Sequence, residues 1–284
     1  MTTPDASPST PIDPNERMPL LRAVGRALVR LLPRNEIVFR LARKIVDRYN
    51  GDMDFDMRTN GELWFAKTMV PRSRVVFDVG ANQGDWAALA HQLNPAARIH
   101  CFEPSPVTFR MLEKNASLPN VTLNPFGLSD RHEERDLWIY DDGSGANSLY
   151  HRVGTIGTQT RTETVAMRSL DAYCSEQGIE RIDFMKVDVE GHEVSVFRGG
   201  ERMFREARVG AVQFEYNDTY IDARTQLKDI WQFFTEAAPD YRFYKLYPTQ
   251  LRYVPEYTQR YETFRYSNWA VLHKDTAAAL GVPA

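Results

Sequence analysis

The fold is decided by the stretch Val75-Val76-Phe77-Asp78-Val79-Gly80-Ala81-Asn82-Gln83-Gly84. Its apolar first half is typical of a short buried strand, and its two glycines frame a tight turn into a helix expected over 86–93. A strand, a glycine turn and a helix in direct succession form the first unit of a doubly wound α/β fold. The turn also brings backbone N–H groups close to any ligand at that edge of the sheet.

Downstream of this unit, apolar runs alternate with helical patterns. Further strands are expected at 98–102, 121–124, 183–187 and 209–214, and the aromatic stretches 241–247 and 268–273 predict a terminal antiparallel hairpin. Strands that alternate with helices pair in parallel, with the connecting helices on both faces. We therefore expect a Rossmann-like, mostly parallel sheet of seven strands.

Three parts of the chain differ in composition. Residues 1–16 are rich in proline, serine and threonine and are expected to form a disordered tail, whereas 61–284 hold the α/β domain with an insertion at about 131–168. Residues 17–60 predict an amphipathic helical extension. Nine basic and two acidic residues give 17–50 a charge of about +7, against about −7 for 51–284. Such a segment either contacts an anionic membrane or packs on the domain as a cap.

Composition excludes several classes of protein. The net charge of −3 leaves no overall basic face, so a nucleic-acid partner is not expected. Cys101 and Cys174 lack the spacing of a zinc site, and two cysteines make no disulfide framework. No apolar run is long enough to span a bilayer and no secretory signal is recognisable, so we expect a cytoplasmic protein, with peripheral contact at the inner membrane face as the alternative.

The glycine turn and a later acid together predict a cofactor site. The G-x-x-x-G spacing of Gly80 and Gly84 lacks the full dinucleotide fingerprint, which disfavours a dinucleotide. Glu103 follows the second strand about twenty residues on, where a carboxylate accepts hydrogen bonds from ribose hydroxyls. Asp78 is expected to face the ammonium group of an amino-acid moiety, so S-adenosylmethionine fits both acids. Ser129 and Asp130, after the third strand, are expected to contact the adenine.

Five motifs in this order resemble the FkbM family of methyltransferases: Phe77-Asp78-Val79-Gly80-Ala81-Asn82, Phe102-Glu103-Pro104, Leu128-Ser129-Asp130, Ser169-Leu170-Asp171 and Lys186-Val187-Asp188-Val189-Glu190-Gly191-His192-Glu193. The likeness covers about 75–217. It implies a class I methyltransferase fold and methyl transfer from S-adenosylmethionine, usually to a hydroxyl of a carbohydrate or another natural product. In such a family Asp78, Gly80, Asn82 and Glu103 contact the cofactor, and Asp188 lies beside the transferable methyl.

Two catalytic hypotheses follow from the fourth and fifth strands. His192 comes directly after the fourth strand, beside Asp188, and histidine is the commonest general base; the alternative is a histidine at a helix start bonded to a neighbouring carboxylate. Asp188 and Glu215 end adjacent strands with Asn217 nearby, and oxygen ligands of this kind suit Mg²⁺. Without an ion, the same carboxylates would bind substrate hydroxyls or stabilise the sulfonium.

We therefore expect an O-methyltransferase whose acceptor is a small molecule, an oligosaccharide or a glycolipid. An oxidoreductase that binds an NAD-type dinucleotide and a catalytically silent cofactor-binding scaffold are the alternatives. The sequence is compatible with a homo-oligomer and does not fix the oligomeric state.

Overall fold

The structure is a computed structural model, and it describes residues 25, 27, 29–152 and 159–283. The tail expected over 1–16 lies outside the described residues. The chain divides into two compact units, Met1–Asn50 and Gly51–Ala284. Residues 51–60 thus belong to the second unit, whereas the sequence grouped them with the helical extension.

The first unit contains helix α2 (Glu36–Asn50). Helical backbone is interrupted at Pro33, because it ends at Leu31 and resumes at Glu36. Asn35 caps the new helix, with its Oδ1 accepting a hydrogen bond of 3.0 Å from the backbone N–H of Val38.

The second unit is built on one mixed sheet of eight strands in the order β10-β9-β11-β8-β7-β1-β2-β3. From β3 to β8 neighbouring strands are parallel, whereas β11 is antiparallel to both of its neighbours. The α/β prediction and the terminal antiparallel pair, β9 with β11, are confirmed. The strands are β1 (Val75–Val79), β2 (Arg98–Phe102), β3 (Val121–Asn124), β7 (Ile182–Val187), β8 (Val209–Tyr216), β9 (Tyr241–Tyr247), β10 (Gln250–Val254) and β11 (Ser267–His273).

The expected count of seven strands is wrong by one, because β10 adds an edge strand. It pairs antiparallel with β9 across the two-residue turn Pro248-Thr249. Its five residues alternate between more and less exposed positions, so it lacks the continuous apolar run that marks the central strands.

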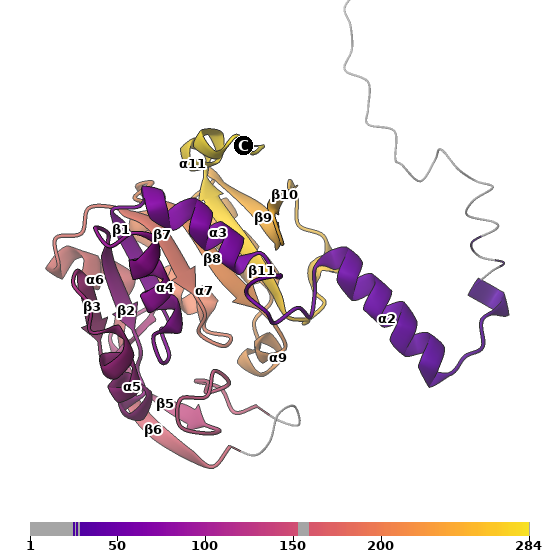
Figure 1. Cartoon of the computed structure of the whole chain (residues 1–284), viewed down its shortest axis with the longest axis horizontal. Coiled ribbons are helices and arrows are strands. Elements are labelled where there is room, and N and C mark those ends of the chain that lie inside the picture. The colour runs from indigo at the N-terminus through magenta and orange to yellow at the C-terminus, as the bar shows by residue number, and fades with distance from the viewer. Residues whose placement is uncertain (1–24, 26, 28, 153–158, 284) are drawn as a thin grey trace, which may run out of the picture. The chain divides into compact units, whose positions relative to one another are not determined.

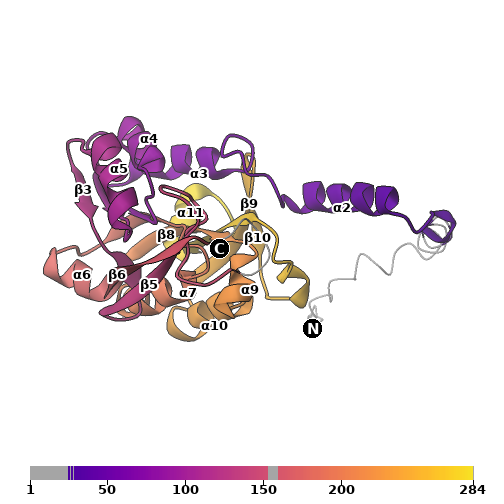
Figure 2. The same ribbon diagram turned by 90° about the horizontal axis from the view of Figure 1, so that it is seen from below.

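Helices cover both faces of this sheet, as Figure 2 shows from below. The apolar cluster on one face takes residues from α3 (Glu62–Met69), α4 (Asp85–Leu93), α5 (Pro106–Ala116) and α11 (Lys274–Leu280). The cluster on the other face takes residues from α6 (Leu170–Glu176), α7 (Glu193–Gly199), α8 (Glu201–Arg205) and α10 (Leu227–Ala237). The short helices η1 (Val70–Arg72), α9 (Thr219–Ala223) and η2 (Gln259–Tyr261) lie in connections.

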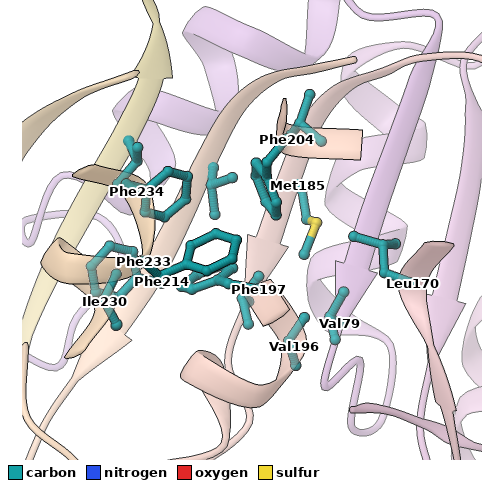
Figure 3. Close-up of a cluster of buried hydrophobic side chains, with 14 of the residues drawn as sticks. Val79, Leu170, Met185, Val196, Phe197, Phe204, Phe214, Ile230, Phe233 and Phe234 are labelled. Atoms are coloured by element: carbon teal, nitrogen blue, oxygen red, sulfur yellow. The ribbon is translucent and has the colours of Figure 1, made fainter. Parts of the chain in front are cut away.

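Phe197 of α7 lies at the centre of the second cluster (Figure 3). Its ring packs edge-on against Phe204, Phe214 and Phe234 at centroid distances of 5.4 to 5.8 Å. Helices α7 and α8 meet at Gly200. A β-carbon there would lie 2.5 Å from Leu170 Cδ2, so the glycine lets α6 pack against the junction.

The predicted insertion forms a small second sheet below the domain (Figure 1). It contains β4 (Gly127–Ser129), β5 (Glu133–Ile139) and β6 (Arg161–Ser169), in the order β4-β6-β5. Leu137, Leu149 and Met167 belong to its apolar core. Gly199 of α7 lies against β4 so closely that a β-carbon would meet Ser129 O at 1.9 Å, which ties the insertion to the main domain.

Candidate active site

A cavity, partly open to solvent, lies where β1, β2 and β7 end. This edge of a doubly wound sheet is where ligands bind in such folds. The insertion contributes the wall opposite the strand ends. The cavity is lined by Val79, Gly80, Asn82, Phe102, Glu103, Pro104, Thr108, Gly127, Leu128, Leu137, Ser144, Gly145, Asn147, Ser148, Leu149, Met167, Asp188, Val189, Glu190 and His192.

Gly80 brings the strand ends together. Its φ of +84° is in the left-handed region, and a β-carbon would lie 1.8 Å from the carbonyl oxygen of Asp188. The backbone N–H groups of Gly80 and Ala81 both donate to Phe102 O, at 3.0 Å each. Gly84 has a different role, because a β-carbon there would meet Leu112 and Ala116 of α5. Gly84 therefore permits helix packing and is not part of the described cavity wall.

Glu103 lies in the cavity wall with its carboxylate fixed by the backbone. It accepts hydrogen bonds from the N–H groups of Asn82 at 3.1 Å and Ser105 at 2.9 Å. Burial raises the pKa of Glu103 to about 7, although these two hydrogen bonds oppose the shift. An ionised carboxylate has about four acceptor positions, so two remain for ligand hydroxyl groups.

Asp78 does not lie where the sequence led us to expect it. It is fully buried on the α3 face of the sheet and is not among the described residues that line the cavity. Neither carboxylate oxygen has a hydrogen-bond partner among the described residues, and burial raises its pKa to about 7. Its strand neighbour Lys186 lies in register beside it. Direct contact between Asp78 and a cofactor stays a prediction that this placement does not favour.

His192 joins the insertion to β4 through both of its ring nitrogens. Nδ1 lies 2.8 Å from the Tyr150 hydroxyl and Nε2 lies 3.0 Å from Ser129 Oγ. Burial lowers the pKa of His192 to about 4, so the ring is neutral at pH 7, with one nitrogen donating and the other accepting. Ser129 and Asp130 lie behind His192 and not in the described cavity wall, so their contact with adenine stays a prediction.

Three carboxylates meet at the end of β7 and β8. One oxygen from each of Asp188, Glu190 and Glu215 lies within 4.8 Å of the other two. Oxygen ligands of one Mg²⁺ ion are at most roughly 4.2 Å apart, so small movements would let the three hold such an ion. The Lys186 ammonium donates to Asp188 Oδ2 at 2.8 Å and already balances one charge. The metal site stays a prediction, now with Glu190 as a third ligand.

The sequence did not predict Glu190 as a site residue. It has a φ of +51°, which is rare for a residue with a side chain, and it lines the cavity. Burial, and then the Asp188 carboxylate, raises its pKa. Arg152 Nη1 lies 3.7 Å from Glu190 Oε2 and Asn217 Nδ2 donates to the same oxygen at 3.4 Å. The sequence did contain a signal for Glu190, because it stands between Asp188 and Gly191 directly after the fourth strand.

A cavity at the carboxyl edge of a doubly wound sheet, beside a glycine turn and an acid after the second strand, defines a protein that binds a nucleoside cofactor. The profile of the family described as "Methyltransferase FkbM domain" matches residues 78–243. The chain belongs to this methyltransferase family, and the predicted resemblance is confirmed.

Curated relatives share part of the chain. The 2-O-methyltransferase NoeI of Sinorhizobium fredii is 32% identical over 51% of this chain and 63% of its own length. The 31-O-demethyl-FK506 methyltransferase FkbM of Streptomyces tacrolimicus is 31% identical over 45% and 59%, and the hexuronic acid methyltransferase AglP of Haloferax volcanii is 29% identical over 57% and 62%. The chain thus spans about three fifths of the length of these relatives. The crystal structure of a methyltransferase FkbM from Methylobacillus flagellatus aligns over 70% of this chain and 43% of that one, with 16% identity and a TM-score of 0.45.

We expect Glu103→Gln to change how stability depends on pH. A carboxyl group whose pKa is raised from 4.5 to about 7 contributes stability below pH 4.5, and this contribution is lost as the pH rises through 7. Glutamine has no charge to bury, so the free energy of unfolding of the variant, relative to the unchanged chain, should be higher at pH 8 than at pH 5, by up to about 3 kcal/mol. Urea unfolding at both pH values measures the difference in free energy of unfolding between the variant and the unchanged chain. If that difference is the same at pH 5 and pH 8, Glu103 is not a buried titrating group.

Proposed function

We propose that this chain is an S-adenosylmethionine-dependent O-methyltransferase that acts on a hydroxyl group of a carbohydrate, a glycolipid or another natural product. The observation that carries the proposal is Glu103, a carboxylate that the backbone fixes in the wall of the cavity beside the Gly80 turn. Membership of the FkbM family supports it.

The residues of the cavity suit such a cofactor. Glu103 would accept hydrogen bonds from the ribose hydroxyls, and the turn of Gly80 and Asn82 would contact the amino-acid moiety. Bound S-adenosylmethionine supplies an electrophilic methyl group on a positively charged sulfur. Asp188 lies at this edge of the cavity, and an ionised carboxylate there favours a cationic ligand over a neutral one.

The acceptor hydroxyl must lose a proton, and two groups in the cavity wall are candidates to take it. His192, with Asp188 beside it, is the base that the sequence predicts, but Tyr150 and Ser129 engage both of its ring nitrogens. Burial and the neighbouring Asp188 carboxylate raise the pKa of Glu190, so its ionised form accepts a proton more readily than an ordinary carboxylate does. We therefore favour Glu190 as the base and His192 as the residue that positions the insertion.

The carbohydrate acceptor rests on relatives whose names include a 2-O-methyltransferase and a hexuronic acid methyltransferase. In this chain the insertion contributes Ser144, Asn147 and Ser148 to the cavity lining. Ser148 Oγ donates to Glu190 O at 2.9 Å and Asn147 Oδ1 accepts from the Tyr140 N–H at 2.9 Å, so a sugar hydroxyl would use their remaining hydrogen-bonding positions. A dinucleotide oxidoreductase is disfavoured because the glycine turn lacks the pyrophosphate fingerprint.

We expect the purified chain to bind S-adenosylmethionine and its demethylated product in calorimetry. Glu103→Gln should weaken both affinities about 10- to 100-fold, the value of hydrogen bonds to a charged group. Glu113→Gln, on the exposed side of α5, is the matched control and should bind like the unchanged chain. Tight binding of NADH, without binding of S-adenosylmethionine or its demethylated product, would overturn the proposal.

The base assignment predicts different losses for two variants. Glu190→Gln should lower turnover about 10²- to 10⁴-fold with cofactor affinity nearly unchanged, because glutamine keeps the size of the side chain but accepts no proton at neutral pH. His192→Gln keeps polar groups near Tyr150 and Ser129 and should lower turnover less. A larger loss for His192→Gln than for Glu190→Gln would return the base role to His192. Because the acceptor is not identified, turnover is first screened with sugars, glycolipids and macrolide-like alcohols as acceptors.

The metal hypothesis is tested separately with the same acceptor. If Asp188, Glu190 and Glu215 hold Mg²⁺, excess chelator should abolish turnover and Mg²⁺ should restore it. Calorimetric titration of Mg²⁺ into the chain checks binding without turnover, and Glu215→Gln should weaken it. Full turnover in chelator would show that the three carboxylates work without an ion.

A further inference from the structure

The sequence of helix α2 separates its apolar and charged side chains onto two faces. At 100° per residue, its apolar side chains other than Ile37 fall within an arc of about 160°. The members of this apolar face are Val38, Phe39, Leu41, Ala42, Ile45, Val46 and Tyr49. Arg43 and Arg48 border the apolar face on its two sides.

No described residue of the first unit covers this apolar face. Five of its large side chains have between 53% and 71% of their surface exposed: Phe39, Leu41, Ile45, Val46 and Tyr49. Single exposed apolar residues are ordinary, but five on one face of one helix form a contiguous patch of the kind that marks an interaction surface.

The charged face is mainly basic. Arg40, Arg43, Lys44 and Arg48 outnumber its two acids, Glu36 and Asp47. The Arg43 guanidinium lies 5.5 Å from the ring centroid of Phe39, so it sits at the border of the apolar face. Long basic side chains at such a border reach lipid headgroups while their stems stay against apolar surface. Arg30 and Arg34 add two more basic residues just before the helix.

We propose that α2 docks in the plane of a lipid bilayer that carries anionic headgroups. An arc of about 160° is wider than the two-position seam of a coiled coil, which argues against a partner helix. Its basic border complements anionic lipid. Among the described residues no helix is long and apolar enough to cross a membrane, so the contact would be peripheral. The proposal is independent of which acceptor the enzyme methylates.

The test is cosedimentation of the full chain with vesicles of phosphatidylcholine, with or without phosphatidylglycerol. The unchanged chain should bind the anionic vesicles more tightly than the neutral ones. Ile45→Glu should weaken binding about tenfold or more, because it places a charge in the centre of the apolar face, whereas Ile45→Leu should bind normally. Arg43→Glu combined with Arg48→Glu should abolish the preference for anionic lipid.

The matched charge control is Arg110→Glu combined with Lys114→Glu on the exposed side of α5, which should bind like the unchanged chain. Equal losses for the two double variants would show that net charge and not α2 governs binding, and would overturn the proposal. So would an unchanged chain that does not bind vesicles. If the unchanged chain does not bind vesicles, two further measurements on Ile45→Glu identify what α2 contacts. A lower unfolding temperature would show that α2 packs on the domain as a cap, and loss of a dimer in sedimentation velocity would show that α2 contacts a second copy of the chain.

Discussion

The close approach of the β1 turn to the end of β7 is the constraint on which the site depends. Only a residue without a side chain fits there, because a β-carbon on Gly80 would overlap the carbonyl oxygen of Asp188. The same turn donates two backbone hydrogen bonds to Phe102 O, which brings Glu103 to the N–H of Asn82. Gly80 therefore lets the Glu103 carboxylate, which would hold the ribose, lie beside the sheet edge at which the methyl group would be transferred.

Buried carboxylates are the second physical theme. Asp78, Glu103 and Glu190 are each buried enough to raise their pKa values, so the protein without ligand meets the cost of burying charge partly by keeping protons. Lys186 offsets part of this cost through its ion pair with Asp188. Perturbed acids in a cavity are characteristic of functional sites, where a cationic ligand or a proton transfer takes advantage of them.

The sequence predicted the central elements well because their signals are local. The bounds of β2, β3 and β9 agree with the prediction. The cap of α5 is local too, since Ser105 Oγ accepts a hydrogen bond from Thr108 N. The edge strand β10 and the three-residue strand β4 were missed because neither has a long apolar run. No residue of β10 lines the described cavity, whereas Gly127 and Leu128 of β4 do.

The features of the site that the sequence did not predict depend on side-chain direction and on contacts between residues far apart in the chain. Asp78 alternates with Phe77 and Val79 along β1, so its side chain points to the opposite face of the sheet, and the prediction had considered only its place at the strand end. The contact between Tyr150 and His192 joins residues 42 positions apart. No local pattern encodes such a contact, because it depends on how the insertion folds back over β7.

Membrane docking by α2, if it occurs, bears on which acceptor the enzyme methylates. A peripheral anchor confines an enzyme to the bilayer surface, where a lipid-linked acceptor is concentrated and a freely diffusing one is not. Docking by α2 would thus raise the effective concentration of a glycolipid acceptor without any new contact in the cavity. It would bring no such gain for a sugar in solution. If α2 binds anionic vesicles, the glycolipid becomes the acceptor class with a physical reason behind it, and the polar wall formed by Ser144, Asn147 and Ser148 would receive its headgroup.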